Sequence, residues 1–222
     1  MKLNLFLQKW KYELLLFALA QHLFIGIFLR DLPFYTTVIW PVNMLILGPA
    51  SVGIFMDKGK WKNRIRWVLF LLVVALPIGL PFFRNMPDYY IYLNLTYVAF
   101  FSFILWELMR FLIKPGYINV DIIVASACGY FLFIEIATFL FQFFYYQDPN
   151  CFKGIDAYNP ASVYMDLVYF SSITLTSIGY GDILPNAHYT KLIASVFGIA
   201  GQFYSVVLVG ILISKFVSKS EK

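Results

Sequence analysis

The sequence predicts an all-α integral membrane protein, and two observations carry that prediction. Of its 222 residues, 61% are hydrophobic and only 13% are charged, about half the charged share of a typical soluble domain. A membrane-spanning helix needs about 20 mostly apolar residues. Six stretches qualify, namely residues 12–29, 32–55, 67–83, 89–113, 120–145 and 189–216. The second contains Pro41 and Pro49, so we expect a kink there.

The placement of basic residues predicts the orientation of these helices. Lys and Arg gather on the cytoplasmic side of membrane proteins. With a cytoplasmic N-terminus, the inner side holds 13 of the 17 Lys and Arg residues, and the outer side keeps Arg30, Arg84, Lys153 and Lys191. We therefore expect a multi-pass protein of the cell membrane, surrounded by lipid, with both termini in the cytoplasm. This placement explains the net charge of +5 without a nucleic-acid partner.

One loop, residues 174–182, lies between the fifth and sixth stretches and reads TLTSIGYGD. Gly179 and Gly181 flank one residue, and glycine adopts backbone conformations in which other residues clash. Alternating glycine and ordinary residues lets successive carbonyls point to one side, where a ring of them can replace the water around a small cation. A glycine-rich turn between helices is the simpler alternative. Nine consistent residues in a re-entrant position between two spans favour the ion-binding interpretation.

These residues resemble the selectivity filter of tetrameric potassium channels, whose signature is TVGYG. Residues 177–181 fall on that pattern with Ser177 for Thr and Ile178 for Val, and Asp182 and Pro185 match the acid and the proline that follow it. The resemblance covers residues 120–216. It implies a filter made of Thr176, Ser177, Ile178, Gly179, Tyr180 and Gly181, in which the carbonyls of residues 177–180 and the Ser177 hydroxyl bind dehydrated K⁺.

The resemblance also implies an architecture. Six transmembrane helices are joined by a re-entrant pore helix and the filter loop, and one filter loop per chain requires a homotetramer around the pore. From the apolar stretches we expect residues 1–116 to form a four-helix transmembrane domain with a voltage-sensor-like layout, and residues 117–222 to form the pore domain with an outer helix, a pore helix, the filter and an inner helix. K⁺ is the permeant ion, and no cofactor is expected.

Residues 161–175 are predicted to form the pore helix, entering the membrane part-way. Pro160 suits its first turn, and the partial negative charge of its C-terminal end would favour a cation below the filter. In the family a tryptophan pair on this helix supports the filter tyrosine. Here the corresponding positions are Tyr169 and Phe170, and Phe170 cannot donate a hydrogen bond to Tyr180.

The sixth stretch contains the residues expected near the gate and the inner cavity. Its glycines are Gly198, Gly201 and Gly210. By its distance from Gly179, Gly201 falls at the hinge glycine of the resembled family, and close helix packing is an equally good interpretation. Packing is the better one for the other two. Gln202 and Ser205 are polar in an apolar helix, so we expect them to face the water-filled cavity or a neighbouring helix.

Asp182 and His188 are predicted to lie at the outer mouth of the pore. Histidine changes charge near physiological pH, so protonated His188 would oppose cation entry by adding like charge. The alternative is a solvated loop histidine without such a role.

Few polar residues interrupt the predicted spans. An acid within a span, such as Glu135, is a functional candidate by default, and we expect it to brace the fifth helix against the pore helix. His22 is expected to pack beside Gln21, and Glu107 to pair with Arg110 one helical turn later. Of the two cysteines, Cys151 lies in a polar loop, where a free thiol is favoured over a bridge between subunits.

The sequence also predicts what the protein is not. We find no nucleophile–base or zinc arrangement, so an enzyme is not expected. The fourth stretch has Arg110 as its only basic residue, at its inner end, so the layout of voltage-gated channels is present without their arginine series. We therefore predict a potassium-selective channel with weak voltage dependence. The alternatives are a poorly selective cation channel of the same architecture and a non-channel membrane protein, such as a subunit of another channel.

Overall fold

The computed structural model describes residues 8–55, 59–83, 86, 88–113 and 120–220. The chain is mostly helical. In chain order its elements are α2 (Lys11–Phe24), η1 (Ile25–Phe28), α3 (Leu32–Phe34), η2 (Tyr35–Ile39), α4 (Trp40–Phe55), α5 (Lys60–Phe83), α6 (Tyr89–Ile113), α7 (Val120–Gln147), η3 (Pro149–Cys151), β1 (Phe152–Lys153), α8 (Pro160–Leu175), β2 (Leu184–Pro185) and α9 (His188–Ser220). The predicted boundary between the two domains, at residues 116 and 117, lies outside the described residues.

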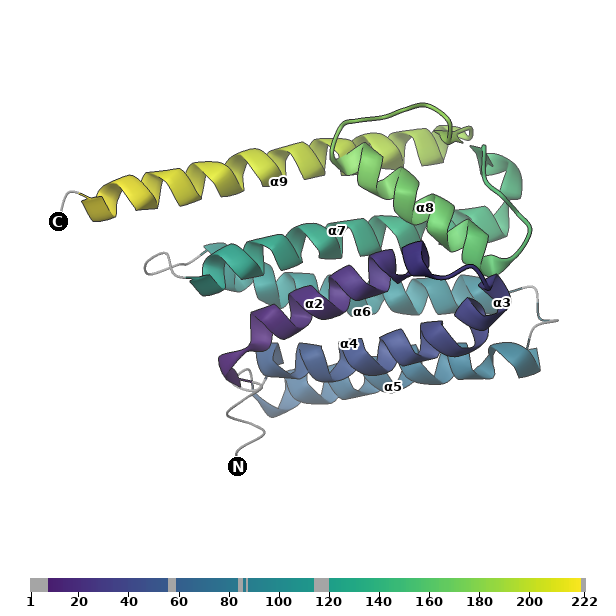
Figure 1. Cartoon of the computed structure of the whole chain (residues 1–222), viewed down its shortest axis with the longest axis horizontal. Helices are drawn as coiled ribbons and strands as arrows, with labels where there is room; N and C mark the ends of the chain where they lie inside the picture. Colours follow the sequence, from purple (N-terminus) through teal and green to yellow (C-terminus); the bar gives the residue numbers. More distant parts are fainter. Residues whose placement is uncertain (1–7, 56–58, 84–85, 87, 114–119, 221–222) are drawn as a thin grey trace.

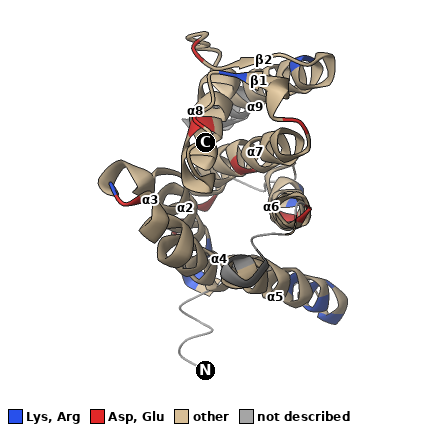
Figure 2. Ribbon diagram, turned by 90° about the vertical axis from the view of Figure 1, so that its right-hand side faces the viewer, with Lys and Arg blue, Asp and Glu red and all other residues tan. Residues whose placement is uncertain are grey.

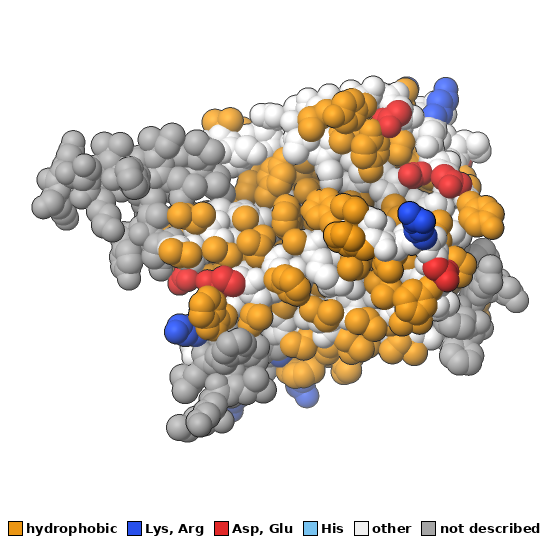
Figure 3. Space-filling model, in the orientation of Figure 1, with side chains coloured by type: hydrophobic (Ala, Val, Ile, Leu, Met, Phe, Trp, Pro, Cys, Tyr) orange, Lys and Arg blue, Asp and Glu red, His pale blue; other side chains and the backbone are white. Residues whose placement is uncertain are grey.

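Helices occupy all six predicted apolar stretches. Four of them are long and apolar enough to cross a membrane within the described residues, namely Lys11–Phe28, Tyr89–Ile113, Val120–Gln147 and His188–Val207. Figure 3 shows a mostly hydrophobic surface along the length of these helices, with charged side chains towards their two ends. The chain thus has the features of a multi-pass membrane protein, and the count of six spans stays a prediction.

The second predicted stretch is one helical run whose hydrogen bonding changes along its length. Its middle part, η2, is a π-helical turn that ends just before Pro41, the second residue of α4. Proline lacks an N–H group and its ring clashes with the carbonyl four residues earlier. A wider turn at this point relieves that clash.

Helix α7 is the centre of the arrangement, because it packs against α2 and α6 on one side and against α8 and α9 on the other. Helices α4 and α5 extend the first group, as Figures 1 and 2 show. The short α8 crosses obliquely beside α7, and α9 runs along the outer edge past the ends of the other helices. As a result, one face of α9 up to Val207 is exposed within the described part of the chain.

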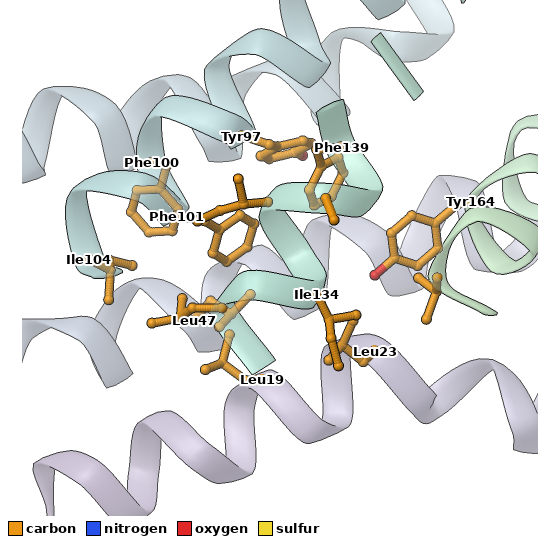
Figure 4. Packing of buried hydrophobic residues seen from close by; sticks show 14 of the residues in the cluster. Leu19, Leu23, Leu47, Tyr97, Phe100, Phe101, Ile104, Ile134, Phe139 and Tyr164 are labelled. Carbon is orange, nitrogen blue, oxygen red and sulfur yellow. The ribbon is translucent and has the colours of Figure 1, made fainter. Parts of the chain in front are cut away.

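A core of aromatic and aliphatic side chains joins α2, α4, α6, α7 and α8 (Figure 4). The ring of Phe139 on α7 lies 4.5 Å from Tyr97 and 5.7 Å from Phe101, both on α6, and 5.7 Å from Tyr164 on α8. Such pairs contribute about 0.5–1.5 kcal/mol each beyond the burial of their area. The aromatic core therefore connects the leading helices, α2 to α6, with α8.

The loop before α8 is tied to the segment after the filter. Strand β1 pairs antiparallel with β2, and the Cys151 carbonyl accepts hydrogen bonds from Asn186 N and Thr190 Oγ1, at 2.7 and 3.0 Å. Cys151 is a free cysteine and fully buried. Burial raises the pKa of its thiol to about 11, which keeps the thiol protonated and unreactive. This environment explains the expected free thiol better than a bridge between subunits.

Candidate functional site: the loop after α8

The site begins with α8, whose first turn is fixed by its sequence. Asn159 caps the helix by accepting hydrogen bonds from Ala161 N and Ser162 N, and the Ser162 hydroxyl accepts one from Asn159 N. Pro160 occupies the first helical position, where its missing N–H costs nothing. This capping box places the start of α8 one residue earlier than predicted.

The C-terminal turn of α8 holds the loop that follows it. The Ile173 carbonyl accepts hydrogen bonds from Ile178 N and Gly179 N, at 2.9 and 3.2 Å, and the Thr174 carbonyl accepts one from Ser177 N at 3.1 Å. The last carbonyls of a helix have no partner within it. Here the first half of the predicted filter satisfies two of them, so the position of the loop follows the position of α8.

The loop backbone alternates between two conformations. Ser177, Gly179 and Gly181 have φ angles of +59°, +56° and +83°, whereas φ is negative at Ile178 and Tyr180. The left-handed region costs a residue with a side chain about 1–2 kcal/mol, which accounts for glycine at two of the three positions. Such alternation turns successive carbonyls to the same side of the chain, the property on which an ion-binding row depends.

Tyr169 supports the outer half of the loop. Its hydroxyl donates a hydrogen bond of 2.7 Å to Asp182 Oδ2, and its ring lies parallel to that of Tyr180, with centroids 6.5 Å apart. The hydrogen bond from Tyr169 holds the pKa of the Asp182 carboxyl below its usual range. Asp182 is therefore ionised at neutral pH and places a negative charge beside the loop.

Phe170 has a different task, because it points away from the loop. It is buried, with its ring 5.2 Å from Phe141 on α7 and 5.4 Å from Phe152 in β1. Tyr169 and Phe170 thus have different roles. Tyr169 donates the hydrogen bond to Asp182, and Phe170 packs α8 against α7 and β1.

Gln202 on α9 reaches the inner end of the loop. Its Nε2 donates a hydrogen bond of 2.7 Å to the Ser177 hydroxyl. Ser177 and Gln202 line one hollow together with Ser195, Gly198, Ile199, Phe203 and Val206. Ser205, by contrast, donates to the Gly201 carbonyl of its own helix at 3.0 Å, so its hydroxyl is already satisfied there.

Gly201 lies where α9 touches the end of α8. A Cβ atom at this position would lie 2.6 Å from the Leu175 carbonyl oxygen and 3.0 Å from Leu175 Cα. At Gly198 the nearest atom, the Thr174 carbonyl oxygen, would be 3.7 Å away, an ordinary contact. Close packing therefore accounts for Gly201, and the same reason does not apply to Gly198. The surroundings of Gly210 lie outside the described part of the chain.

The two residues predicted at the outer mouth are both exposed. Asp182 is held by Tyr169, whereas His188 is the first residue of α9 and its ring meets that of Tyr189 edge-on at 5.4 Å. His188 is thus a helix-terminal residue and not a loop residue. Among the described residues, no group of three His, Cys, Asp or Glu side chains could hold a metal ion.

Three polar residues of the spans have partners that differ in part from those expected. Glu135 contacts His22 on α2, with Oε1 2.6 Å from Nδ1, and does not brace α7 against α8 directly. The two residues lie 113 positions apart, so no local pattern pairs them, although both are titratable groups within apolar stretches. Gln21 donates to Asn43 on α4 and not to its neighbour.

The predicted pair of Glu107 and Arg110 is confirmed, with 3.6 Å between Oε1 and Nη1. Lys62 of α5 also reaches Glu107 at 2.5 Å. This contact joins the first turn of α5 to the last turn of α6, a relationship that the sequence did not indicate.

Comparison with known proteins shows what this part of the chain is similar to. Residues 129–218, from the middle of α7 to the end of α9, match the ion channel family. The prediction of a potassium channel relative is confirmed. Over 51 residues, or 23% of the chain, the sequence is 41% identical to two-pore potassium channel 1 of Arabidopsis thaliana. Over 57 residues, or 26% of the chain, it is 37% identical to two pore potassium channel a of Oryza sativa subsp. japonica.

These matches cover 13% and 16% of the two plant proteins. No solved structure matches the chain significantly. Over residues 129–218, which contain most of α7, α8, the loop and nearly all of α9, the chain is therefore similar to ion channels.

Proposed function

We propose that this protein is a potassium-selective channel that conducts K⁺ passively through a pore formed by four copies of the chain. The observation that carries the proposal is the backbone of residues 177–181, with left-handed residues at every second position, held by the last turn of α8. Four such loops around an axis would form cages of carbonyl oxygens that replace the hydration shell of K⁺. The Ser177 hydroxyl adds a ligand at the inner end.

The exposure of the loop supports assembly around a pore. Ile178 and Tyr180 are 55% and 72% exposed in the single chain, at a depth where non-helical backbone must be buried in protein or line a water path. The face of α9 next to the loop is also unpartnered and apolar, and its exposed residues recur at helical spacing: Leu192, Val196, Ile199, Phe203 and Val206. Neighbouring copies of the chain would cover part of this face.

The orientation follows from the charges. Lys62 and Arg110 meet Glu107 at one end of the bundle, and α2 begins and α9 ends towards the same side (Figure 1). By the positive-inside rule this end is cytoplasmic. The loop and Asp182 then face outwards, with His188 close to the external solution, where its protonation would weaken cation entry.

Weak voltage dependence belongs to the same proposal. Steep gating uses three or four charges per subunit, each worth about 2.3 kcal/mol per 100 mV. Arg110 lies in the last turn of α6, pairs with Glu107 and stacks on Trp106 at 5.2 Å. A single paired arginine at a helix end cannot supply such a charge movement.

Ion flux from purified protein in liposomes tests the proposal. Vesicles loaded with K⁺ should lose it when protein is present, and vesicles loaded with Na⁺ should lose far less. Equal loss of both ions would favour the poorly selective cation channel. Loss no greater than that of protein-free vesicles would refute conduction by this chain alone.

A further inference from the structure

Tyr164, in the second turn of α8, is enclosed by residues from the leading helices. It is 1% exposed, and its ring centroid lies 5.5 Å from His22 on α2, 6.2 Å from Tyr35 in η2, 5.6 Å from Trp40 on α4 and 5.7 Å from Phe139 on α7. Figure 4 shows the ring reaching from α8 towards this interior, with its hydroxyl on the side of Ile134 and Leu23. Tyr164 therefore fixes the first turns of α8 against α2, α4 and α7.

The Tyr164 hydroxyl ends in a buried polar contact. It lies 3.2 Å from His22 Nδ1, and the same nitrogen lies 2.6 Å from Glu135 Oε1. His22 and Glu135 are both 0% exposed. Isolated buried polar and charged groups are costly, so each of these two side chains depends on its contact with the other.

His22 Nδ1 is the atom that contacts both the Tyr164 hydroxyl and Glu135. Within the described part of the chain, His22 Nε2 and Glu135 Oε2 are buried without a hydrogen-bond partner. Unpaired buried polar atoms destabilise a fold. These two unpaired atoms lie close together between α2, α7 and α8. Hydrophobic packing alone does not explain why His22 and Glu135 are placed there.

Tyr164 and the predicted filter are connected through one rigid element. Tyr164 and Ile173 both belong to the 16-residue helix α8. The Ile173 carbonyl accepts hydrogen bonds from the amides of Ile178 and Gly179. A tilt of α8 at its first turns therefore displaces the loop at the other end. The contacts of Tyr164 hold the first turns of α8, as those of Phe170 hold its later turns.

We propose that His22 and Glu135 are positioning residues of the conduction pathway, which hold α8 through Tyr164 and thereby set the geometry of the filter. The leading helices then influence ion selectivity through their contacts with α8. This inference rests on the proposed channel function.

The reversal potential under opposed K⁺ and Na⁺ gradients separates this role from a structural one, because it does not depend on the number of folded channels. Full-length tetramers isolated by size should be compared in planar bilayers. Tyr164→Phe removes one hydroxyl and keeps the ring, and it should lower the K⁺ over Na⁺ permeability ratio about threefold to tenfold, as expected for the loss of one hydrogen bond.

Tyr97→Phe is the matched control. Tyr97 is equally buried, and its hydroxyl donates to the Val73 carbonyl at 3.3 Å, within the leading helices and away from α8. Its ratio should stay within about twofold of the wild type. A Tyr164→Phe ratio no lower than that of Tyr97→Phe would overturn the inference.

Two changes at Glu135 complete the test if Tyr164→Phe does not assemble. Glu135→Gln keeps a group that can hydrogen-bond His22 and should retain most of the selectivity, whereas Glu135→Ala should lose it. If both variants assemble with the wild-type ratio, the pair has no positioning role and the inference is wrong. A wild-type channel that fails to select K⁺ would refute the proposed function itself, before any variant is compared.

Discussion

Gln202 on α9 donates a hydrogen bond of 2.7 Å to the hydroxyl of Ser177, 25 residues earlier, at the inner end of the predicted filter. A hydroxyl oxygen has two acceptor sites. With one taken by the Gln202 amide, the other can face an ion. The contact also joins α9 to the loop, so a movement of α9 would change the surroundings of the proposed innermost ion site.

Gln202→Leu should therefore weaken K⁺ binding at that site. One lost hydrogen bond of about 1 kcal/mol corresponds to a roughly fivefold weaker affinity. The measurement is single-channel conductance against K⁺ concentration, in which the half-saturating concentration should rise. Ser205→Ala is the control, because the Ser205 hydroxyl bonds within its own helix. Equal effects of the two changes would mean that the contact with Ser177 does not matter.

Tyr169→Phe should make conduction more sensitive to external acid. The hydrogen bond from Tyr169 lowers the pKa of Asp182, so the carboxylate persists above that lowered pKa and is lost only as the pH falls through it. Without the hydroxyl the pKa returns towards the usual range of aspartate. The midpoint of acid inhibition should then move to higher pH in a titration of K⁺ current.

The pH at which external acid halves the K⁺ current decides this prediction. His188→Gln is a useful companion, since it removes the other side chain predicted at the outer mouth and leaves the contact of Asp182 intact. An unchanged acid midpoint in Tyr169→Phe would show that Asp182 does not control cation entry.

Gly201→Ala should be far more harmful than Gly198→Ala. The new methyl group at position 201 would lie 2.6 Å from the Leu175 carbonyl oxygen, so α8 or α9 must shift, whereas position 198 has room. Overpacking of this kind destabilises by about 1–3 kcal/mol. The apparent Tm of the purified protein should fall clearly for the first variant only. Equal melting temperatures would favour a hinge at Gly201 over close packing.

The conductance–voltage relation should be shallow. Arg110 and its partner Glu107 lie in the last turns of α6 and would feel little of the membrane field. Neutralising the arginine in Arg110→Gln should leave the slope unchanged. A curve as steep as those of channels with an arginine series would locate gating charge elsewhere in the chain.

The positions of the helices could be predicted because apolar length and composition decide them locally. The predicted stretches 89–113 and 120–145 coincide with α6 and α7 to within two residues. The first two turns of α5 were missed, because their basic residues carry no membrane signal although Lys60–Phe83 is one helix. Hydropathy detects the apolar part of a helix and not its polar extension.

The contacts of the candidate site were less predictable. The filter residues stand out through glycine spacing, and the sequence named Gln202 and Glu135 as unusual. Their partners, Ser177 and His22, are 25 and 113 residues away. Such pairs depend on how the helices are placed side by side, and no periodicity within one helix encodes that placement.

The reversal potential of the purified wild-type protein decides whether the chain forms a K⁺-selective pore. With K⁺ on one side of a bilayer and Na⁺ on the other, the potential should approach that of a membrane permeable to K⁺ alone. Gly179→Ala should lose this preference, because φ at position 179 is +56° and a residue with a side chain is strained there. A wild-type reversal potential near zero, or an unchanged preference in Gly179→Ala, would contradict the account.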